Sequence, residues 1–151
     1  MEKIRIISTG GTIDSSIDYD PTKKSVFNGT NIPEILKQAR LNYKIELEPI
    51  MQKDGADITD DDRNIIYERC RDSNEECIVI THGTDTMVDT ARYLGKKEIE
   101  NKTIVLVGSF IPLSQEYSDA FFNLGYALAS SSLLPQGIWV AMGGEVSLGI
   151  K

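Results

Sequence analysis

Short apolar runs alternate with helical patterns along this chain, and this alternation restricts the fold more than any other feature of the sequence. The runs are Ile4–Ser8, Tyr43–Met51, Cys77–Thr81, Thr103–Val107 and Ile138–Met142. The helical patterns are Pro33–Arg40, Asp60–Arg71 after the candidate N-cap Thr59, Thr86–Leu94 and Asp119–Ser131. Most runs are nearly continuous Ile, Val and Leu, as in strands covered on both faces. The order predicts an α/β domain in three layers, with a largely parallel sheet and helices on both faces.

Size, charge and cysteine content narrow the class of protein. A chain of 151 residues is about one domain, so we expect residues 1–151 to form a single unit that folds without staples. Two cysteines and one histidine are too few for a disulfide framework or for most zinc sites, and no metal or cofactor is expected. The formal charge of -7 argues against nucleic-acid and membrane partners. Without a signal segment or an apolar span, the sequence predicts a soluble, cytoplasmic protein.

Two of the apolar runs stop in small, hydroxyl-rich turns that contain glycine. They read STGGTI at residues 8–13 and THGTDT at residues 81–86. Open α/β sheets bind ligands at the carboxyl ends of their strands, so these turns are expected to face one pocket. Thr12 follows two glycines, and its hydroxyl with nearby amide protons has the elements of a nucleophile and an oxyanion site. A helix N-cap or a plain turn is an equal alternative at this stage.

The second turn carries Thr84 and Asp85, which alone are more typical of a helix cap than of a site. Asp85 is alternatively a buried anion that holds a substrate ammonium. His82, the only imidazole, lies inside the turn and is expected to be structural. A threonine nucleophile would therefore need another base, either the amine of a lysine or the oxygen of a tyrosine. A phosphate-binding loop is disfavoured, because both glycine-rich nucleotide motifs are missing and Asp14 would repel a pyrophosphate.

Two further segments leave alternatives open. The polar stretch Asp14–Gly29 is long for a connector, which indicates a functional lid or a disordered segment. Apolar positions on the last helix suit either the core, which their helical spacing favours, or a subunit interface. These positions are Phe121, Phe122, Leu124 and Leu128.

The two turns together resemble the signatures of the bacterial-type L-asparaginases and glutaminase-asparaginases, in their amino-terminal domain. The likeness covers essentially all 151 residues and includes the segment from Val107 to Leu124. It implies a flavodoxin-like sheet and an amidohydrolase that cleaves a side-chain carboxamide through a threonine acyl-enzyme. It also implies a small amide substrate and a homo-oligomer in which another chain closes the pocket.

The resemblance assigns roles to particular residues. Thr12 matches the nucleophile, Thr84 matches the threonine that works with an aspartate and a lysine, and Asp85 matches the aspartate that holds the substrate ammonium. Backbone amides beside Gly11 and Thr84 are expected to complete the oxyanion site. The substrate-binding positions are thus Gly11, Gly55, Gly83 and Asp85.

Three departures from the family pattern bear on activity. Gly55 falls where the family has a serine that grips the substrate carboxylate. Tyr19 is the only tyrosine in the stretch that should supply the family's lid tyrosine. Lys151 lies a few residues early for the catalytic lysine, and a shorter loop would be needed to bring it to the matching position.

Full-length relatives are about twice this length, so no second domain is expected here. The alternative function is therefore a non-catalytic amino-acid or metabolite-binding module, or an interaction subunit.

Overall fold

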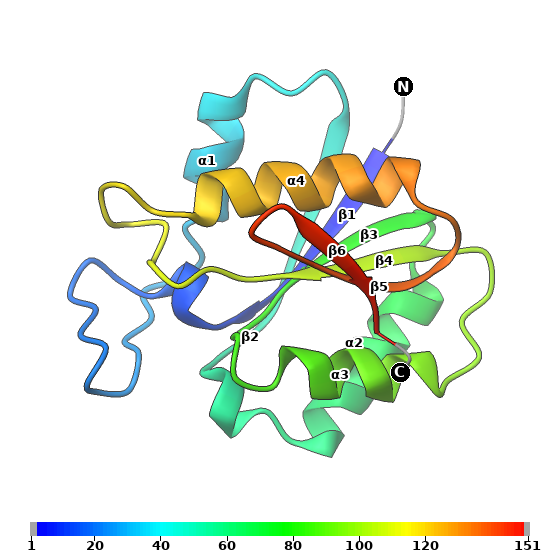
Figure 1. Ribbon diagram of the computed structural model, residues 1–151, viewed down its shortest axis with the longest axis horizontal. Helices are drawn as coiled ribbons and strands as arrows, with labels where there is room; N and C mark the ends of the chain where they lie inside the picture. The colour runs from blue at the N-terminus through cyan, green and yellow to red at the C-terminus, as the bar shows by residue number, and fades with distance from the viewer. Residues whose placement is uncertain (1–2, 150–151) are drawn as a thin grey trace.

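The computed structural model describes residues 3–149, which form a six-stranded sheet flanked by helices (Figure 1). The strands are β1 Lys3–Gly10, β2 Lys44–Lys53, β3 Cys77–Thr81, β4 Thr103–Val107, β5 Gly137–Met142 and β6 Glu145–Leu148. The helices are α1 Ile32–Ala39, α2 Asp60–Asp72, α3 Met87–Gly95 and α4 Ala120–Leu133. The strand order is β2-β1-β3-β4-β5-β6, and β1 to β5 run parallel. The expected three-layer α/β architecture is confirmed.

Helices cover both faces of the sheet (Figure 1), and a cluster of buried apolar side chains lies on each face. On one face, α1 and α4 pack against buried side chains such as Ile6, Val79 and Val105. On the other face, α2 and α3 pack against Ile80 and Leu106. Because alternate side chains of a strand point to opposite faces, these fully covered strands read as continuous apolar runs in the sequence.

The strand order places the carboxyl ends of β1 and β3 next to each other. β1 pairs with β3 from Ile4 opposite Cys77 to Ser8 opposite Thr81, so the two hydroxyl-rich turns leave the sheet side by side. In the sheet, β2 lies on one side of β1 and β3 lies on the other, so the strand order reverses at β1. Open α/β sheets bind ligands at the point where the strand order reverses. The fold alone thus brings residues 9–12 and 81–86 to one place.

Most predicted elements are present, and several have the expected limits. β3 and β4 begin and end at the predicted residues, and β2, which contains most of the run Tyr43–Met51, lies at an edge of the sheet. Thr59 caps α2 through a reciprocal pair of hydrogen bonds with Asp62. The prediction missed β6, which pairs antiparallel with β5 after a turn at Gly143 and Gly144.

Helix α4 corrects one expectation about the core. Leu124 and Leu128 are buried as predicted, but Phe121 and Phe122 are 46% and 61% exposed. The two phenylalanines follow one another in the sequence, and α4 turns only two of these four apolar positions fully toward the sheet.

None of the helices within residues 3–149 has the length and apolar character needed to cross a membrane.

Candidate active site

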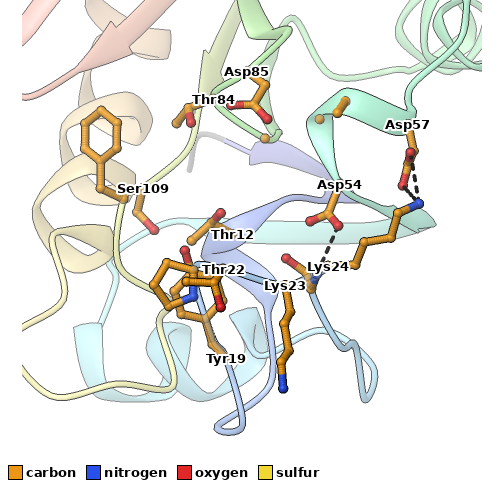
Figure 2. A pocket seen from close by; sticks show the side chains of 16 residues that line it. Thr12, Tyr19, Thr22, Lys23, Lys24, Asp54, Asp57, Thr84, Asp85 and Ser109 are labelled. Carbon is orange, nitrogen blue, oxygen red and sulfur yellow. Dashed lines mark hydrogen bonds and ion pairs between the residues drawn. The ribbon is translucent and has the colours of Figure 1, made fainter.

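A pocket of about 420 Å³ opens at the carboxyl ends of β1, β2 and β3 (Figure 2). It brings together the predicted residues Thr12, Tyr19, Gly55, Gly83, Thr84 and Asp85. Sequence reasoning did not name the other polar residues of its wall, which include Lys23, Lys24, Asp54, Asp57 and Ser109. The expectation that the two threonine turns share one pocket is therefore confirmed in the geometry.

The first turn presents Thr12 at the start of a 3-10 turn, Thr12–Asp14, whose N-cap position belongs to Gly11. Thr12 therefore does not occupy the cap position, which was one of the two alternatives to a site role; the plain turn was the other. Gly11 has a φ of 79°, a conformation that other residues rarely adopt. The Gly11 amide donates to the Lys53 carbonyl at 2.8 Å, so it is occupied and does not face the pocket as a free donor.

Glycines from the ends of β1, β2 and β3 meet by direct backbone contact. A Cβ added to Gly11 would lie 2.4 Å from the Gly83 nitrogen, and one added to Gly83 would lie 2.5 Å from the Gly55 nitrogen. Both distances are far below ordinary contact. The close approach needs the absence of side chains, and it sets how near the three turns come to one another.

The second turn places Thr84 and Asp85 on the pocket wall ahead of α3. Thr86 takes the N-cap position of α3 without capping it, and its hydroxyl instead donates to the Gly55 carbonyl at 2.5 Å. The cap interpretation of this turn is therefore wrong. The Asp85 side chain is exposed, so the expectation of a buried anion is also wrong for this open pocket.

The stretch from residue 14 to residue 29, called the lid here, is ordered against its surroundings. Its base is held by Asp14, which accepts the Asn31 amide at 2.6 Å, and its far side is held where Ser25 donates its amide to Asp54 at 3.0 Å. An exposed ion pair, Lys24 with Asp57 at 3.1 Å, lies beside this contact (Figure 2). The lid carries Tyr19 into the pocket wall. In the structure this stretch thus packs against the pocket, and its role as a functional lid stays a prediction.

Two buried titratable groups lie next to the pocket residues. Burial raises the pKa of Asp14, although the Asn31 amide and the Thr30 hydroxyl partly oppose this shift. Burial lowers the pKa of His82, the Gly83 carbonyl opposes that shift, and the charge of Arg63 adds to it. His82 is fully buried behind the pocket wall, in agreement with the expected structural role.

Two further expectations concern the catalytic lysine and a bound metal ion. Lys151 lies outside the described residues. Among residues 3–149, no group of three or more His, Cys, Asp or Glu side chains is arranged to hold a metal ion.

Among known protein families, residues 3–151 match the one described as Asparaginase, N-terminal. The chain belongs to the asparaginase family. It is 33% identical over 157 residues to the L-asparaginase of Thermococcus kodakarensis, covering 99% of this chain and 46% of that protein. It is 30% identical over 151 residues to a glutamyl-tRNA(Gln) amidotransferase subunit from Methanococcus vannielii, covering 97% of this chain and 35% of that protein.

The fold agrees with solved asparaginases. The structure of a probable cytoplasmic L-asparaginase from Campylobacter jejuni superposes with a TM-score of 0.85 at 28% identity, over 99% of this chain and 48% of that one. This asparaginase-family chain thus spans less than half the length of the three relatives named here.

Proposed function

We propose that this domain hydrolyses the side-chain carboxamide of asparagine or a related small amide to the acid and ammonia. The observation that carries the proposal is the meeting of Thr12, Thr84 and Asp85 in one pocket, in a chain of the asparaginase family. The fold, the two signature turns and L-asparaginase relatives all support the same reaction class.

In the proposed reaction, the Thr12 hydroxyl attacks the carboxamide carbon and loses its proton to a base. The C–N bond then breaks, the nitrogen leaves with a proton as ammonia, and an ester joins the acyl group to Thr12. Water attacks this ester, releases the acid and restores the hydroxyl. Since Lys53 occupies the Gly11 amide, the amides of Thr12 and Thr84 are the proposed oxyanion donors.

The other site residues take supporting roles in the proposal. Asp85, with its exposed carboxylate in the pocket wall, binds the ammonium of the substrate. Tyr19 supplies the lid hydroxyl, and Lys151 is the proposed partner of Thr84 in proton transfer. Gly55 offers no hydroxyl to a substrate carboxylate, so we expect weaker affinity for free asparagine than a serine would give.

The test is ammonia release from L-asparagine, L-glutamine and a panel of small amides. T12A and T84A are expected to abolish turnover, whereas the matched hydroxyl deletion S132A, on the exposed side of α4, is expected to leave it unchanged. A mass increase on the Thr12 peptide after rapid acid quench would report the acyl-enzyme. Turnover that survives T12A would refute the nucleophile.

A second candidate function, a pocket-bearing module without activity, is favoured by the open pocket and by glycine at position 55. The chain would then bind an amino acid or another metabolite, or act as one component of a complex. One relative is named as a component of an amidotransferase, which supports the second form. Ligands that raise the melting temperature of the wild type but not of D85N, without ammonia release, would favour the module. A stable homo- or hetero-oligomer would show whether another chain completes the pocket.

A further inference from the structure

The buried His82 ring makes two hydrogen bonds that fix where its proton lies. Its Nδ1 is 2.7 Å from the Gly83 carbonyl oxygen, and its Nε2 is 2.8 Å from the Thr90 hydroxyl. A carbonyl oxygen only accepts, so Nδ1 carries the proton. Since burial keeps the ring neutral, Nε2 is left as an acceptor.

The next two partners confirm the same direction. Thr90 on α3 is fully buried, and its hydroxyl oxygen accepts the Nε proton of Arg63 on α2 at 2.9 Å. A guanidinium only donates, so the Thr90 hydroxyl is free to give its own proton to His82 Nε2. The hydrogen bonds therefore run one way, from Arg63 through Thr90 and His82 to the Gly83 carbonyl. Other charges near this chain of bonds are Asp60, which pairs with Arg63, and Asp89 on α3.

The last acceptor of the chain lies in the pocket wall. The Gly83 carbonyl and the Thr84 N–H belong to one planar trans peptide and point in opposite directions. A bond that draws the carbonyl toward the buried ring therefore turns the Thr84 N–H away from that ring, and both Gly83 and Thr84 line the pocket. Glycine has little intrinsic preference among backbone conformations, so this peptide needs an external restraint to keep one orientation.

We propose that His82 is a positioning residue that holds the Gly83–Thr84 peptide with its amide toward the pocket, and that Arg63 and Thr90 set the tautomer that lets it do so. The inference rests on the proposed function in one respect, since it gives the held amide a use as an oxyanion donor. Its structural claim concerns only the peptide and the ring, and is tested without turnover.

The first test reads the tautomer by ¹⁵N NMR on the full chain. His82 is the only histidine, so its ring signals need no assignment. We expect a protonated Nδ1 and an unprotonated Nε2 near neutral pH, in the wild type and in T90S, which keeps the hydroxyl. A ring protonated at Nε2, or one that averages between tautomers in the wild type, would overturn the proposal, and this reading needs no variant to fold.

The second test reads the peptide itself through hydrogen exchange and the amide resonance of Thr84. T90V keeps the shape of the side chain but removes the hydroxyl, and it is expected to speed Thr84 exchange at least tenfold while T90S leaves it unchanged. Amides in the centre of β4 serve as the control for global stability. An unchanged Thr84 amide in a folded T90V protein would refute the positioning role.

Kinetics then separate this inference from the proposed function. With an amide substrate in hand, T90V is expected to lower kcat by roughly tenfold or more with little change in KM, and T90S is expected to restore it, because a misplaced oxyanion donor acts on the transition state. If no amide is turned over by the wild type, the proposed function fails while the two NMR results still decide the positioning claim. Equal kcat values in T90V and the wild type would refute the catalytic use of the held amide.

Discussion

Replacement of Gly83 by alanine tests whether backbone contact between the turns holds the pocket together. The new Cβ would lie 2.5 Å from the Gly55 nitrogen and 2.7 Å from its Cα. Ordinary contact needs about 3.4 Å or more, so one backbone must move by nearly 1 Å. Overpacking of this kind costs about 2–3 kcal/mol. At a size of 151 residues that loss corresponds to a fall in Tm of roughly 4–12 °C.

Two matched substitutions make this a graded series. A Cβ on Gly55 would lie 3.2 Å from Gly83 backbone atoms, which is tight but tolerable, so G55A is expected to cost at most about 1 kcal/mol. Gly125 lies within α4 and has nothing within 4 Å of a built Cβ. G125A is therefore expected to raise stability by about 0.5–1 kcal/mol through better helix propensity. None of the three positions has a positive φ, so backbone strain at the alanine does not enter the comparison.

Urea unfolding followed by circular dichroism gives the free energy of unfolding for each variant. The expected order of stability is G125A, wild type, G55A and then G83A. If G83A unfolds at the same urea concentration as G55A or above it, the backbone contact does not constrain the turns and the reasoning fails. Ligand binding by G83A is expected to weaken in parallel, since the same shift displaces the pocket wall.

Three further outcomes follow from contacts described above. Loss of the capping hydroxyl in T59A is expected to cost α2 about 1 kcal/mol, measured by urea unfolding against T59S. K24A removes an exposed ion pair with Asp57 and is expected to change stability by less than about 0.5 kcal/mol, yet to speed proteolytic cleavage of the lid. His82 has a pKa lowered by burial, so the unfolded chain takes up a proton first as the pH falls below about 6.5. The neutral, buried His82 ring therefore makes its full contribution to the free energy of unfolding above that pH. Below it, this contribution declines by at most about 1.4 kcal/mol per pH unit. NMR is expected to show that the ring of the folded protein stays neutral over this range.

The sequence allowed the sheet and its ligand-binding end to be predicted because both depend on local pattern. Continuous apolar runs marked β3 and β4 to the residue, and glycine with threonine marked the turns that follow β1 and β3. The hairpin to β6 also had a local signal that was overlooked. Gly143 and Gly144 both have positive φ, as a two-residue hairpin turn of type I′ requires.

What the sequence did not reveal depends on contacts between distant residues. Asp54 approaches the lid only because Ser25 donates to it across 29 positions, and Lys24 meets Asp57 across 33. The exposure of Asp85 likewise depends on which segments surround the pocket, and no local pattern reports this. The link from Arg63 to His82 through Thr90 joins α2, α3 and the turn after β3, each of which looked ordinary on its own.

The glycine contacts at the strand ends also limit how this pocket can be altered. Because Gly11 and Gly83 present only main chain there, against backbone that a Cβ would meet at 2.4 Å and 2.5 Å, these positions offer little room for tuning chemistry with side chains. Variation in ligand preference has to enter through the lid and through the segment that carries Ser109. A directed-evolution library aimed at new amides would therefore be best concentrated on residues 19–25 and 109–110, with Gly11 and Gly83 held constant.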